Sequence, residues 1–412
     1  MSMRIQIVTV GTTGSVAPYT GLAHRLLADG HQVELATHAA FEPMVACCGL
    51  RMRPLTADPF AGLIAAHAGR ARGLAGARAL VSSTSRAARA LVDDLLAAVD
   101  PAADLVLLST LATPVGWLAA EHHGVPSAGV YLQPDAPTRE FGPSTLPWRD
   151  PGAGNVRRAQ LANGVLDALH RSAVRTARRR LGVRASGAHR LRLQRERAHW
   201  PIHHGISPSV LPRPADWRPE LTMDGYWWPH LCPDWRPPDE LVDFLAAGPP
   251  PVLIGFGSMM PGDPEQLGKL VVRALRAAGL RGIVQSGWAG LRASGDDILT
   301  IGAVPHSWLL PYTAAVVHHA GAGTSAATLR AGVPSVPVPV FTDQPWWAAR
   351  LVQLGAAGGV LPIEALTADR LADALQQTVR DGSLTRNARA LSAKLEHEDG
   401  AGAVARAVGR RG

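Results

Sequence analysis

Long apolar runs are absent from this sequence of 412 residues. A membrane-spanning helix needs about 18 or more consecutive apolar residues, and no stretch reaches that length. The N-terminus, MSMRIQIVTV, leads directly into a strand pattern instead of a signal peptide. We therefore expect a soluble, cytoplasmic protein. Because the length exceeds what one hydrophobic core usually covers, we also expect two domains.

Cysteine is scarce as well. The chain has three cysteines, Cys47, Cys48 and Cys232, and their spacing matches neither a disulfide framework nor a metal site. We expect them to be reduced thiols with a structural role, as is usual inside cells.

Lysine occurs only twice, so arginine carries almost all of the net charge of +8. Twelve arginines concentrate in residues 157–197, where they meet only Asp167 and Glu196. Apolar residues keep near-helical spacing through the first half of this stretch, which favours helices with one solvated basic face. A surface for an acidic ligand, a nucleic acid or a membrane is the alternative. No aromatic residue interleaves the arginines before Trp200, which disfavours nucleic acid.

Strand-like and helix-like segments alternate along the chain, and they do so twice. In the first half, the pattern predicts strands at residues 4–10, 33–37, 104–109 and 126–132 and a helix at 18–30. In the second half, it predicts strands at 252–258, 282–287, 297–302, 314–319 and 335–340 and helices at 264–279 and 324–332. Such alternation is typical of parallel sheets covered by helices, an α/β fold.

Proline and tryptophan concentrate between Ile206 and Pro251, where the sequence is too proline-rich for a sheet interior. We expect this segment to connect two similar halves, with a ligand in the cleft at the carboxyl ends of the strands. The predicted division is a first Rossmann-like domain over 1–215, a linker over 216–250, a second Rossmann-like domain over 251–385, and a C-terminal helix over 386–412 that could pack back on the first domain.

The stretch VVHHAGAGTSAAT, residues 316–328, combines a strand end with a glycine turn and a helix start. Free N–H groups and the positive end of the helix dipole make such a turn suitable for phosphate. His319 and Thr324 can donate further hydrogen bonds. A glycine turn that only packs a strand against a helix would look the same, so the pattern alone leaves both readings open.

Neighbouring segments add the other parts of a nucleotide-sugar site. Asp343 and Gln344 follow the next predicted strand, and a carboxylate and an amide suit the hydroxyls of a sugar. Ser258 ends another strand, and the segment VPHSWL, residues 304–309, offers backbone and ring surface for a nucleobase. Together these residues predict a pocket for a nucleotide-diphosphate sugar.

The second half resembles the family 1, nucleotide-sugar-dependent glycosyltransferases of the GT-B fold. The branch it is similar to contains antibiotic glycosyltransferases of actinobacteria, such as those of the vancomycin pathway, and sterol glucosyltransferases. The matching sequences are PPVLIGFGSM, SGWAGL, VPHSWLLP, VVHHAGAGTSAATLRAGVPSVPVPVFTDQPWWAARL and LTADRLADAL. The similarity is close over residues 250–375 and looser over the N-terminal VGTTGSVAPYTGLAHRLLADGHQVELATHAAF.

The resemblance implies roles for individual residues. It places the donor diphosphate at Ser258, His319, Gly321, Ala322, Gly323 and Thr324, the donor sugar at Asp343 and Gln344, and the base at Val304 in the segment that ends at His306. It also implies two Rossmann-like domains that face each other across a cleft, an acceptor in the first of them, and inverting transfer from a UDP- or dTDP-sugar. Family members need no metal ion or other cofactor.

The general base is where this sequence departs from the family. The loop VGTTGSVAP has Ser15 where related loops carry Asp, and a serine hydroxyl cannot take up a proton unaided near neutral pH. Asp135 and His38, which follow other predicted strands, are alternative bases. The acceptor could instead be acidic enough to need little help, or the protein could be a sugar-nucleotide-binding partner with weak or no transfer.

Residues 60–89 and 138–197 are expected to line the acceptor site, because the first half receives the acceptor in this fold. Their Ala, Leu and Trp148 content favours an apolar polyketide-, peptide- or sterol-like molecule, and their arginines leave room for an acidic one. We expect no nucleic acid partner and no stable membrane insertion. A nicotinamide enzyme would need GxGxxG after the first strand, which is absent. A sugar-nucleotide epimerase would need more acid and base groups than Asp343.

Overall fold

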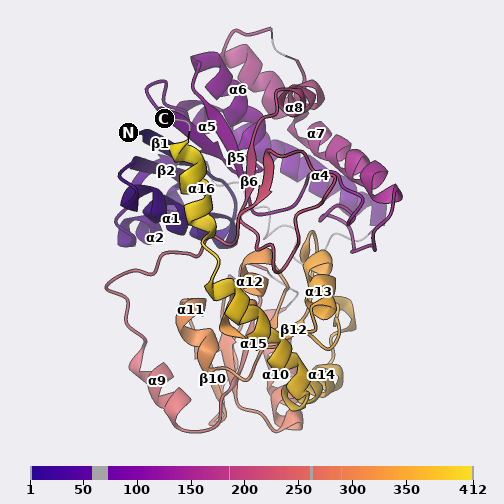
Figure 1. Ribbon diagram of the computed structural model, residues 1–412. Helices are drawn as coiled ribbons and strands as arrows, with labels where there is room; N and C mark the ends of the chain where they lie inside the picture. The colour runs from indigo at the N-terminus through magenta and orange to yellow at the C-terminus, as the bar shows by residue number, and fades with distance from the viewer. Residues whose placement is uncertain (1, 58–72, 185, 260–262, 289, 411–412) are drawn as a thin grey trace. The chain divides into compact units, whose positions relative to one another are not determined.

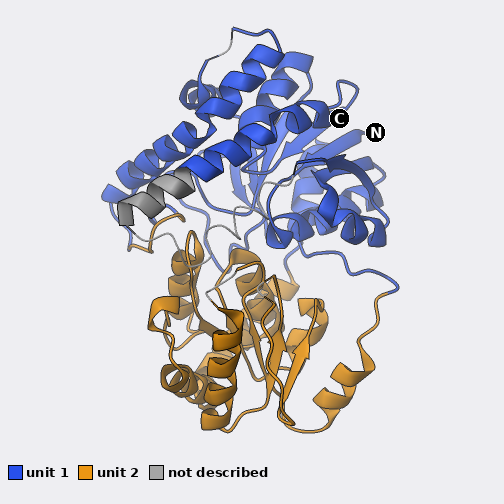
Figure 2. Cartoon of the chain, turned by 180° about the vertical axis from the view of Figure 1, so that it is seen from behind, with its two compact units in different colours: residues 1–143, 150–234, 398–412 blue, residues 144–149, 235–397 orange. Residues whose placement is uncertain are grey.

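The computed structural model describes residues 2–57, 73–184, 186–259, 263–288 and 290–410. The chain divides into two compact units, coloured separately in Figure 2. Unit 1 comprises residues 1–143, 150–234 and 398–412, and unit 2 comprises residues 144–149 and 235–397.

Unit 1 is built on a seven-stranded sheet in the order β3-β2-β1-β4-β5-β6-β7, with every neighbouring pair parallel. Its strands are β1 (Arg4–Val8), β2 (Gln32–His38), β3 (Arg51–Leu55), β4 (Leu105–Leu108), β5 (Ser127–Tyr131), β6 (Ile202–His204) and β7 (Leu221–Met223). β4 and β5 are buried along their whole length, as expected for central strands with helices on both faces.

Helices cover both faces of this sheet (Figure 1). They are α1 (Thr13–Ala28), α2 (Glu42–Cys47), α4 (Gly73–Ala90), α5 (Val92–Ala98), α6 (Thr113–His123), α7 (Gly154–Arg180), α8 (Ala188–Arg197) and α16 (Gly400–Gly409). Side chains of α1, α2 and α16 form one apolar core with the strands. Side chains of α5, α6, α7 and α8 form the core on the other face.

Unit 2 has a five-stranded parallel sheet in the order β10-β9-β8-β11-β12. Its strands are β8 (Val252–Gly255), β9 (Gly282–Gln285), β10 (Ile298–Ile301), β11 (Ala315–His318) and β12 (Ser335–Pro337). Its helices are α9 (Asp239–Ala246), α10 (Pro264–Ala278), α11 (His306–Leu309), α12 (Ala322–Ala331), α13 (Gln344–Gln353), α14 (Ala368–Arg380) and α15 (Gly382–Glu396). From β8 the chain runs outward through β9 to β10 and then returns to β11 on the other side of β8, so the strand order reverses between β8 and β11.

Local sequence signals explain why α10 begins and ends where it does. The side chain of Asp263 accepts a hydrogen bond from the backbone N–H of Glu265, and Pro264 occupies the first helical position. At the other end Gly279 has a φ of 68°, a left-handed conformation that closes a helix at little cost for glycine. The predicted helix at 264–279 therefore agrees with α10 to within a residue.

The predicted α/β class with two Rossmann-like sheets is confirmed, and every predicted strand is present. The prediction missed β3, β6 and β7. β3 contains proline and two arginines, and β6 and β7 have three residues each, too few for a periodic pattern. The predicted helix at 18–30 begins earlier, at Thr13, and contains Pro18 inside its second turn.

The segment predicted as an inter-domain linker is divided between the two units. β7 lies within it, and residues up to Asp234 belong to unit 1 while Trp235 and those after it belong to unit 2. The Trp227 ring is buried, 5.6 Å from the ring of Tyr19, whereas Trp235 packs 5.5 Å from Trp308 of unit 2. The tryptophans of this segment therefore anchor it to one unit or the other.

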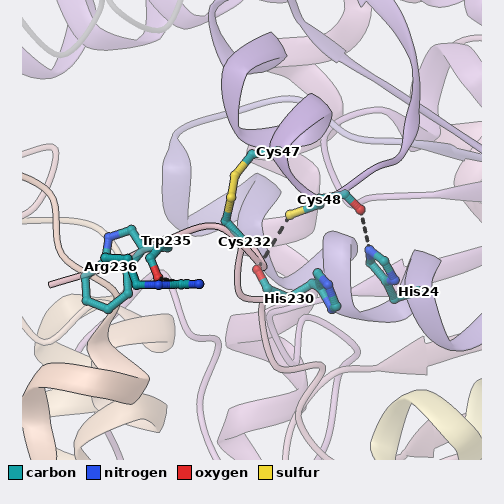
Figure 3. The surroundings of a disulfide bond; sticks show 7 residues. All are labelled: His24, Cys47, Cys48, His230, Cys232, Trp235 and Arg236. Carbon is teal, nitrogen blue, oxygen red and sulfur yellow. Dashed lines mark hydrogen bonds between the residues drawn. A yellow bond between two sulfur atoms is a disulfide. The ribbon is translucent and has the colours of Figure 1, made fainter.

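The cysteine prediction is wrong, because Cys47 and Cys232 form a disulfide with Cα atoms 5.4 Å apart (Figure 3). Their sequence separation of 185 positions explains why the pairing could not be predicted from the sequence. Cys48 is free and buried. The stacked rings of His24 and His230, 3.4 Å apart, also hold the Cys232 segment against α1. The disulfide therefore links two segments that side-chain packing also holds together.

The C-terminal segment forms two helices where one was predicted. α15 packs against α12 in unit 2, whereas α16 packs against α1 in unit 1 (Figure 1). Arg25 of α1 pairs with Asp399 at 2.9 Å just before α16. Gly400 is required there, because a Cβ at this position would collide with the backbone of Gly225.

Among the helices in the described part of the chain, none combines the length and the apolar content that crossing a membrane requires.

Candidate functional site

The candidate site in unit 2 is built on the two turns that follow β8 and β11. Ligands of open parallel sheets bind at the carboxyl ends of the strands where the strand order reverses, and in unit 2 that point lies between β8 and β11. Ser258 lies in the first turn. Its neighbour Gly257 has a φ of 59°, and a Cβ on it would lie 3.2 Å from Cε1 of His319 in the second turn. The two turns therefore meet.

The β11–α12 turn presents bare backbone. Gly321 caps α12 without any side-chain hydrogen bond, so the N–H groups of the first three helical residues, Ala322, Gly323 and Thr324, have no partner within the helix. A Cβ on Gly323 would meet nothing within 4 Å, so space is open above this N–H group. Hydrogen-bond donors and the positive end of the α12 dipole therefore face the same open space.

Gly321 is needed for close approach and not for an unusual backbone angle. Its φ is −65°, which any residue can adopt. A Cβ there would collide with Nε2 of His319. Ala320, one residue earlier, has a φ of 60°, which is uncommon for a residue with a side chain. The turn is therefore shaped to lay the His319 ring across the start of α12.

Two histidines of this turn are neutral near pH 7. Burial, followed by the charge of His319 and then of His306, lowers the pKa of His318 to about 3. Burial and then His306 lower the pKa of His319 to about 4. Burial also lowers the pKa of His306. The structure therefore brings three histidines close enough to affect one another's charge.

Two of these rings have a nitrogen that makes no hydrogen bond. Nδ1 of His318 accepts from the backbone N–H of Ala320 at 3.1 Å, which places the ring proton on Nε2. Nε2 of His318 and Nδ1 of His319 are buried without a hydrogen-bond partner. Buried polar atoms usually have partners. The exceptions in this turn are consistent with a ligand site.

Asp343 and Gln344 lie where α13 begins, after β12. Oε1 of Gln344 accepts from the backbone N–H groups of Val340 and Phe341 at 2.8 and 3.1 Å, so its carbonyl oxygen is already used. Thr342 donates to Oδ1 of Asp343 at 2.9 Å. Thr342 has a φ of 58°, which is strained for a β-branched residue. Neither this strain nor the capping role of Gln344 could be predicted from the sequence.

Val304 and His306 lie at the start of α11. The Val304 side chain is buried in the apolar core beside Leu309. Only its backbone is therefore left to contact a nucleobase. The ring of His306 affects the charge of both His318 and His319, which places it next to the β11–α12 turn.

The predicted bases of unit 1 have different surroundings. Ser15 lies in the first turn of α1, and a Cβ on Gly11 would lie 2.8 Å from its Oγ. His38 ends β2 and is fully buried; its Nε2 accepts from the N–H of Gly11 at 3.1 Å, and its Nδ1 donates to the carbonyl of Ala57 at 2.8 Å. Both nitrogens are used, so the geometry argues against His38 as a base. It holds the β1–α1 turn in place.

Asp135 lies in the loop after β5 and lines a cavity of about 360 Å³ inside unit 1. Its carboxylate is close enough to Tyr131 to contribute to the raised pKa of that phenol, for which burial is the main cause. Sequence reasoning did not find this cavity, because its walls come from segments more than a hundred residues apart. Of the segments expected to line the acceptor site, α7 and α8 contribute to these walls, whereas residues 60–72 lie outside the described residues.

No three or more His, Cys, Asp or Glu side chains in the described ranges are arranged to hold a metal ion.

Comparison with known proteins supplies the family. Residues 5–126 match the glycosyltransferase family 28 N-terminal domain, and residues 283–407 match the erythromycin biosynthesis protein CIII-like C-terminal domain. The O-mycaminosyltylonolide 6-deoxyallosyltransferase of Streptomyces fradiae is 34% identical to the chain, over 97% of the chain and 95% of that protein. The chain belongs to the GT-B glycosyltransferases. The predicted enzyme class is confirmed.

Two further comparisons agree with the branch and the fold predicted for this glycosyltransferase. The sterol 3-beta-glucosyltransferase UGT80A2 of Arabidopsis thaliana is 32% identical over 98% of the chain, but the chain spans 64% of that protein's length. The structure of the glycosyltransferase VinC in complex with dTDP matches with a TM-score of 0.66 at 21% identity, and the match covers the whole of both chains. This likeness confirms the GT-B fold.

Proposed function

We propose that this glycosyltransferase moves a sugar from a UDP- or dTDP-sugar to a hydroxyl of a natural-product acceptor, with inversion and without a metal ion. The observation that carries the proposal is the bare N-terminus of α12 beside the neutral, buried ring of His319. An acceptor oxygen attacks the anomeric carbon as the bond from that carbon to the diphosphate breaks.

The β11–α12 turn would stabilise the leaving diphosphate. Negative charge grows on the leaving group in the transition state, so donors aimed at it act most strongly there. The free N–H groups of Ala322, Gly323 and Thr324, the α12 dipole and one N–H of His319 are such donors. Ser258, in the adjoining turn, would add a hydroxyl. Because these groups supply the electrostatic stabilisation, we infer that no metal ion or other cofactor is required.

The donor sugar would bind at the start of α13. The Asp343 carboxylate can accept from sugar hydroxyls, and the amide N–H groups of Gln344 can donate to them while its carbonyl oxygen caps the loop. The backbone at Val304 and the ring of His306 would contact the nucleobase. The dTDP complex of VinC supports a thymidine or uridine nucleotide as the donor's leaving group.

The acceptor class follows from the relatives. The names of these relatives give sterols and O-mycaminosyltylonolide as their acceptors, so we infer a sterol-, polyketide- or peptide-like acceptor for this chain. Of the predicted bases, Asp135 is the one whose side chain lines a cavity, and Ser15 would need another group to take its proton. The cytoplasmic location predicted from the sequence stays a prediction.

A panel of UDP- and dTDP-sugars tests the proposal. We expect one nucleotide class to raise the melting temperature of the enzyme, and slow release of free nucleotide diphosphate from its sugar to be detectable by chromatography. His319→Ala should abolish that release. If every nucleotide stabilises the protein without any chemistry, even with acceptors added, the non-transferring partner protein becomes the better account. If none binds, the donor site is wrong.

A further inference from the structure

The cavity in unit 1 lies at the carboxyl ends of β4 and β5. Its volume is about 360 Å³, and the loops after these two strands form one wall while α7 and α8 form another. Much of the lining is apolar, including Leu111, Val174, Leu191, Trp200, Ile202 and Leu221. A space of this size and composition suits a small ring-containing molecule.

Three residues that line the cavity carry buried polar atoms without a hydrogen-bond partner. They are Nη1 of Arg195, Nε2 of His204 and Nε1 of Trp217. Leaving such an atom without a partner lowers the stability of the protein, and the cost is larger for a charged group. Three such atoms on the walls of one cavity provide hydrogen-bonding positions for a ligand.

Arg195 provides a fixed positive charge. Its guanidinium lies 5.4 Å from the ring centre of Trp117 and 5.8 Å from that of Trp200, which hold it in place. Among the described residues, none forms a hydrogen bond or ion pair with the side chain of Arg195. Burial lowers its pKa, but an arginine stays protonated.

Other charged groups of the wall near Arg195 already have partners, whereas Asp135 faces the same cavity as a carboxylate. Arg192 binds Asp167 and Glu196 at 3.1 and 2.7 Å, and Arg218 binds Glu220 at 3.1 Å. Asp216 accepts from Thr138 and from the backbone N–H of Arg139. The Asp167 and Glu196 carboxylates act on the charge of Arg195 without a hydrogen bond to it, so Nη1 of Arg195 keeps its donors for an oxygen-bearing group on a ligand.

His204 and Trp217 add one acceptor and one donor. Nδ1 of His204 lies 2.6 Å from the carbonyl oxygen of Thr222, so Nδ1 carries the proton, and burial lowers the pKa of His204 to about 4. Its Nε2 can therefore only accept, as from a hydroxyl. Nε1 of Trp217 can only donate. The two rings stack at 4.9 Å, which fixes both.

We propose that this cavity binds the acceptor, and that the acceptor is an apolar, ring-containing molecule with a carboxylate or similar oxyanion. Arg195 binds the oxyanion, Trp217 donates to a second oxygen, and His204 accepts from a hydroxyl. Arg195 is thus a specificity-determining residue. The acceptor assignment rests on the proposed function, whereas the preference for an anion rests on the cavity itself.

Two fluorescent probes with the same ring skeleton test this preference. 1-Anilinonaphthalene-8-sulfonate carries an anion, and N-phenyl-1-naphthylamine does not. In the full chain, we expect Arg195→Met to weaken binding of the anionic probe roughly tenfold or more, since hydrogen bonds to charged groups are worth about 1.5–3 kcal/mol. Binding of the neutral probe should change less than twofold. The matched control is Arg197→Met, because Arg197 is an exposed arginine of the same helix.

Arg195→Lys and Leu191→Trp complete the test. The lysine variant keeps the charge and should retain most of the preference for the anionic probe, even if the methionine variant folds poorly. The tryptophan variant fills the cavity and should weaken both probes. Equal losses for both probes in Arg195→Met and Arg195→Lys, or undiminished binding in Leu191→Trp, would overturn the proposal. Stabilisation by dTDP or UDP, measured on the same variants, reports on the donor site separately.

Discussion

Both units place histidines at the carboxyl ends of parallel strands, but the surroundings of these histidines differ. In unit 1, His38 uses both ring nitrogens to bind backbone groups of Gly11 and Ala57. In unit 2, Nδ1 of His319 is buried without a partner beside the bare start of α12. A histidine at a strand end therefore stabilises the fold when backbone groups bind both of its ring nitrogens. When one ring nitrogen has no such partner, that nitrogen is available to a ligand.

The largest expected effect comes from removing the ring of His319, whose Nδ1 has no hydrogen-bond partner. His319→Ala should lower kcat by on the order of a hundred- to a thousandfold, or about 2.7–4 kcal/mol in the barrier, because one donor to the leaving group is lost. The melting temperature should change little. Steady-state kinetics and a thermal melt on the same preparation measure both. Near-normal turnover would show that His319 does not face the leaving group.

For His38, whose two ring nitrogens both make hydrogen bonds, we expect a loss of stability and not of nucleotide binding. His38→Ala leaves the N–H of Gly11 and the carbonyl of Ala57 without their partner, at a cost of roughly 1–3 kcal/mol for each group. Urea unfolding should therefore show a clear loss of stability. Nucleotide binding by unit 2 should be unaffected. A stable His38→Ala variant with a large loss in kcat would return His38 to the list of candidate bases.

Substitutions of two glycines in the β11–α12 turn distinguish the effect of the turn's conformation from the effect of open space for the nucleotide. A Cβ at Gly321 collides with the His319 ring, so Gly321→Ala should displace the ring and lower both activity and stability. A Cβ at Gly323 meets nothing, so Gly323→Ala should keep or slightly raise the stability, since alanine suits a helix better than glycine. It should still weaken dTDP or UDP binding, because the methyl group occupies the space above the amides. Calorimetric titration measures this, and unchanged affinity would move the diphosphate elsewhere.

A further expected effect is a dependence of stability on pH. Burial lowers the pKa of His204, His318 and His319 from the usual 6.5 to about 4, 3 and 4. Below pH 6.5 the unfolded chain therefore binds protons that the folded protein does not, so the free energy of unfolding falls as the pH drops towards 4. Above pH 6.5 these histidines are neutral in both the folded and the unfolded chain, so their effect on the free energy of unfolding no longer changes with pH. Melting temperatures between pH 7.5 and 4.5 should fall, with a shallower slope for His318→Gln. An equal slope would show that His318 is not held neutral.

Most of the fold could be predicted from the sequence, because β1, β4, β8 and β11 are short apolar runs, and glycine turns follow β1, β8 and β11. The β11–α12 turn could be predicted for the same reason, whereas its role in binding the donor stays a prediction. The Cys47–Cys232 pair and the Arg195 cavity could not, since their residues are distant in sequence. Nor could the difference between His38 and His319, because it depends on which backbone groups reach each ring.

A crystal structure of the enzyme with dTDP or UDP tests the central claim most directly. We predict that β-phosphate oxygens accept hydrogen bonds from the amides at the start of α12 and from the His319 ring, with the nucleobase beside Val304. A nucleotide bound elsewhere, with the start of α12 unoccupied or blocked by neighbouring side chains, would contradict the account.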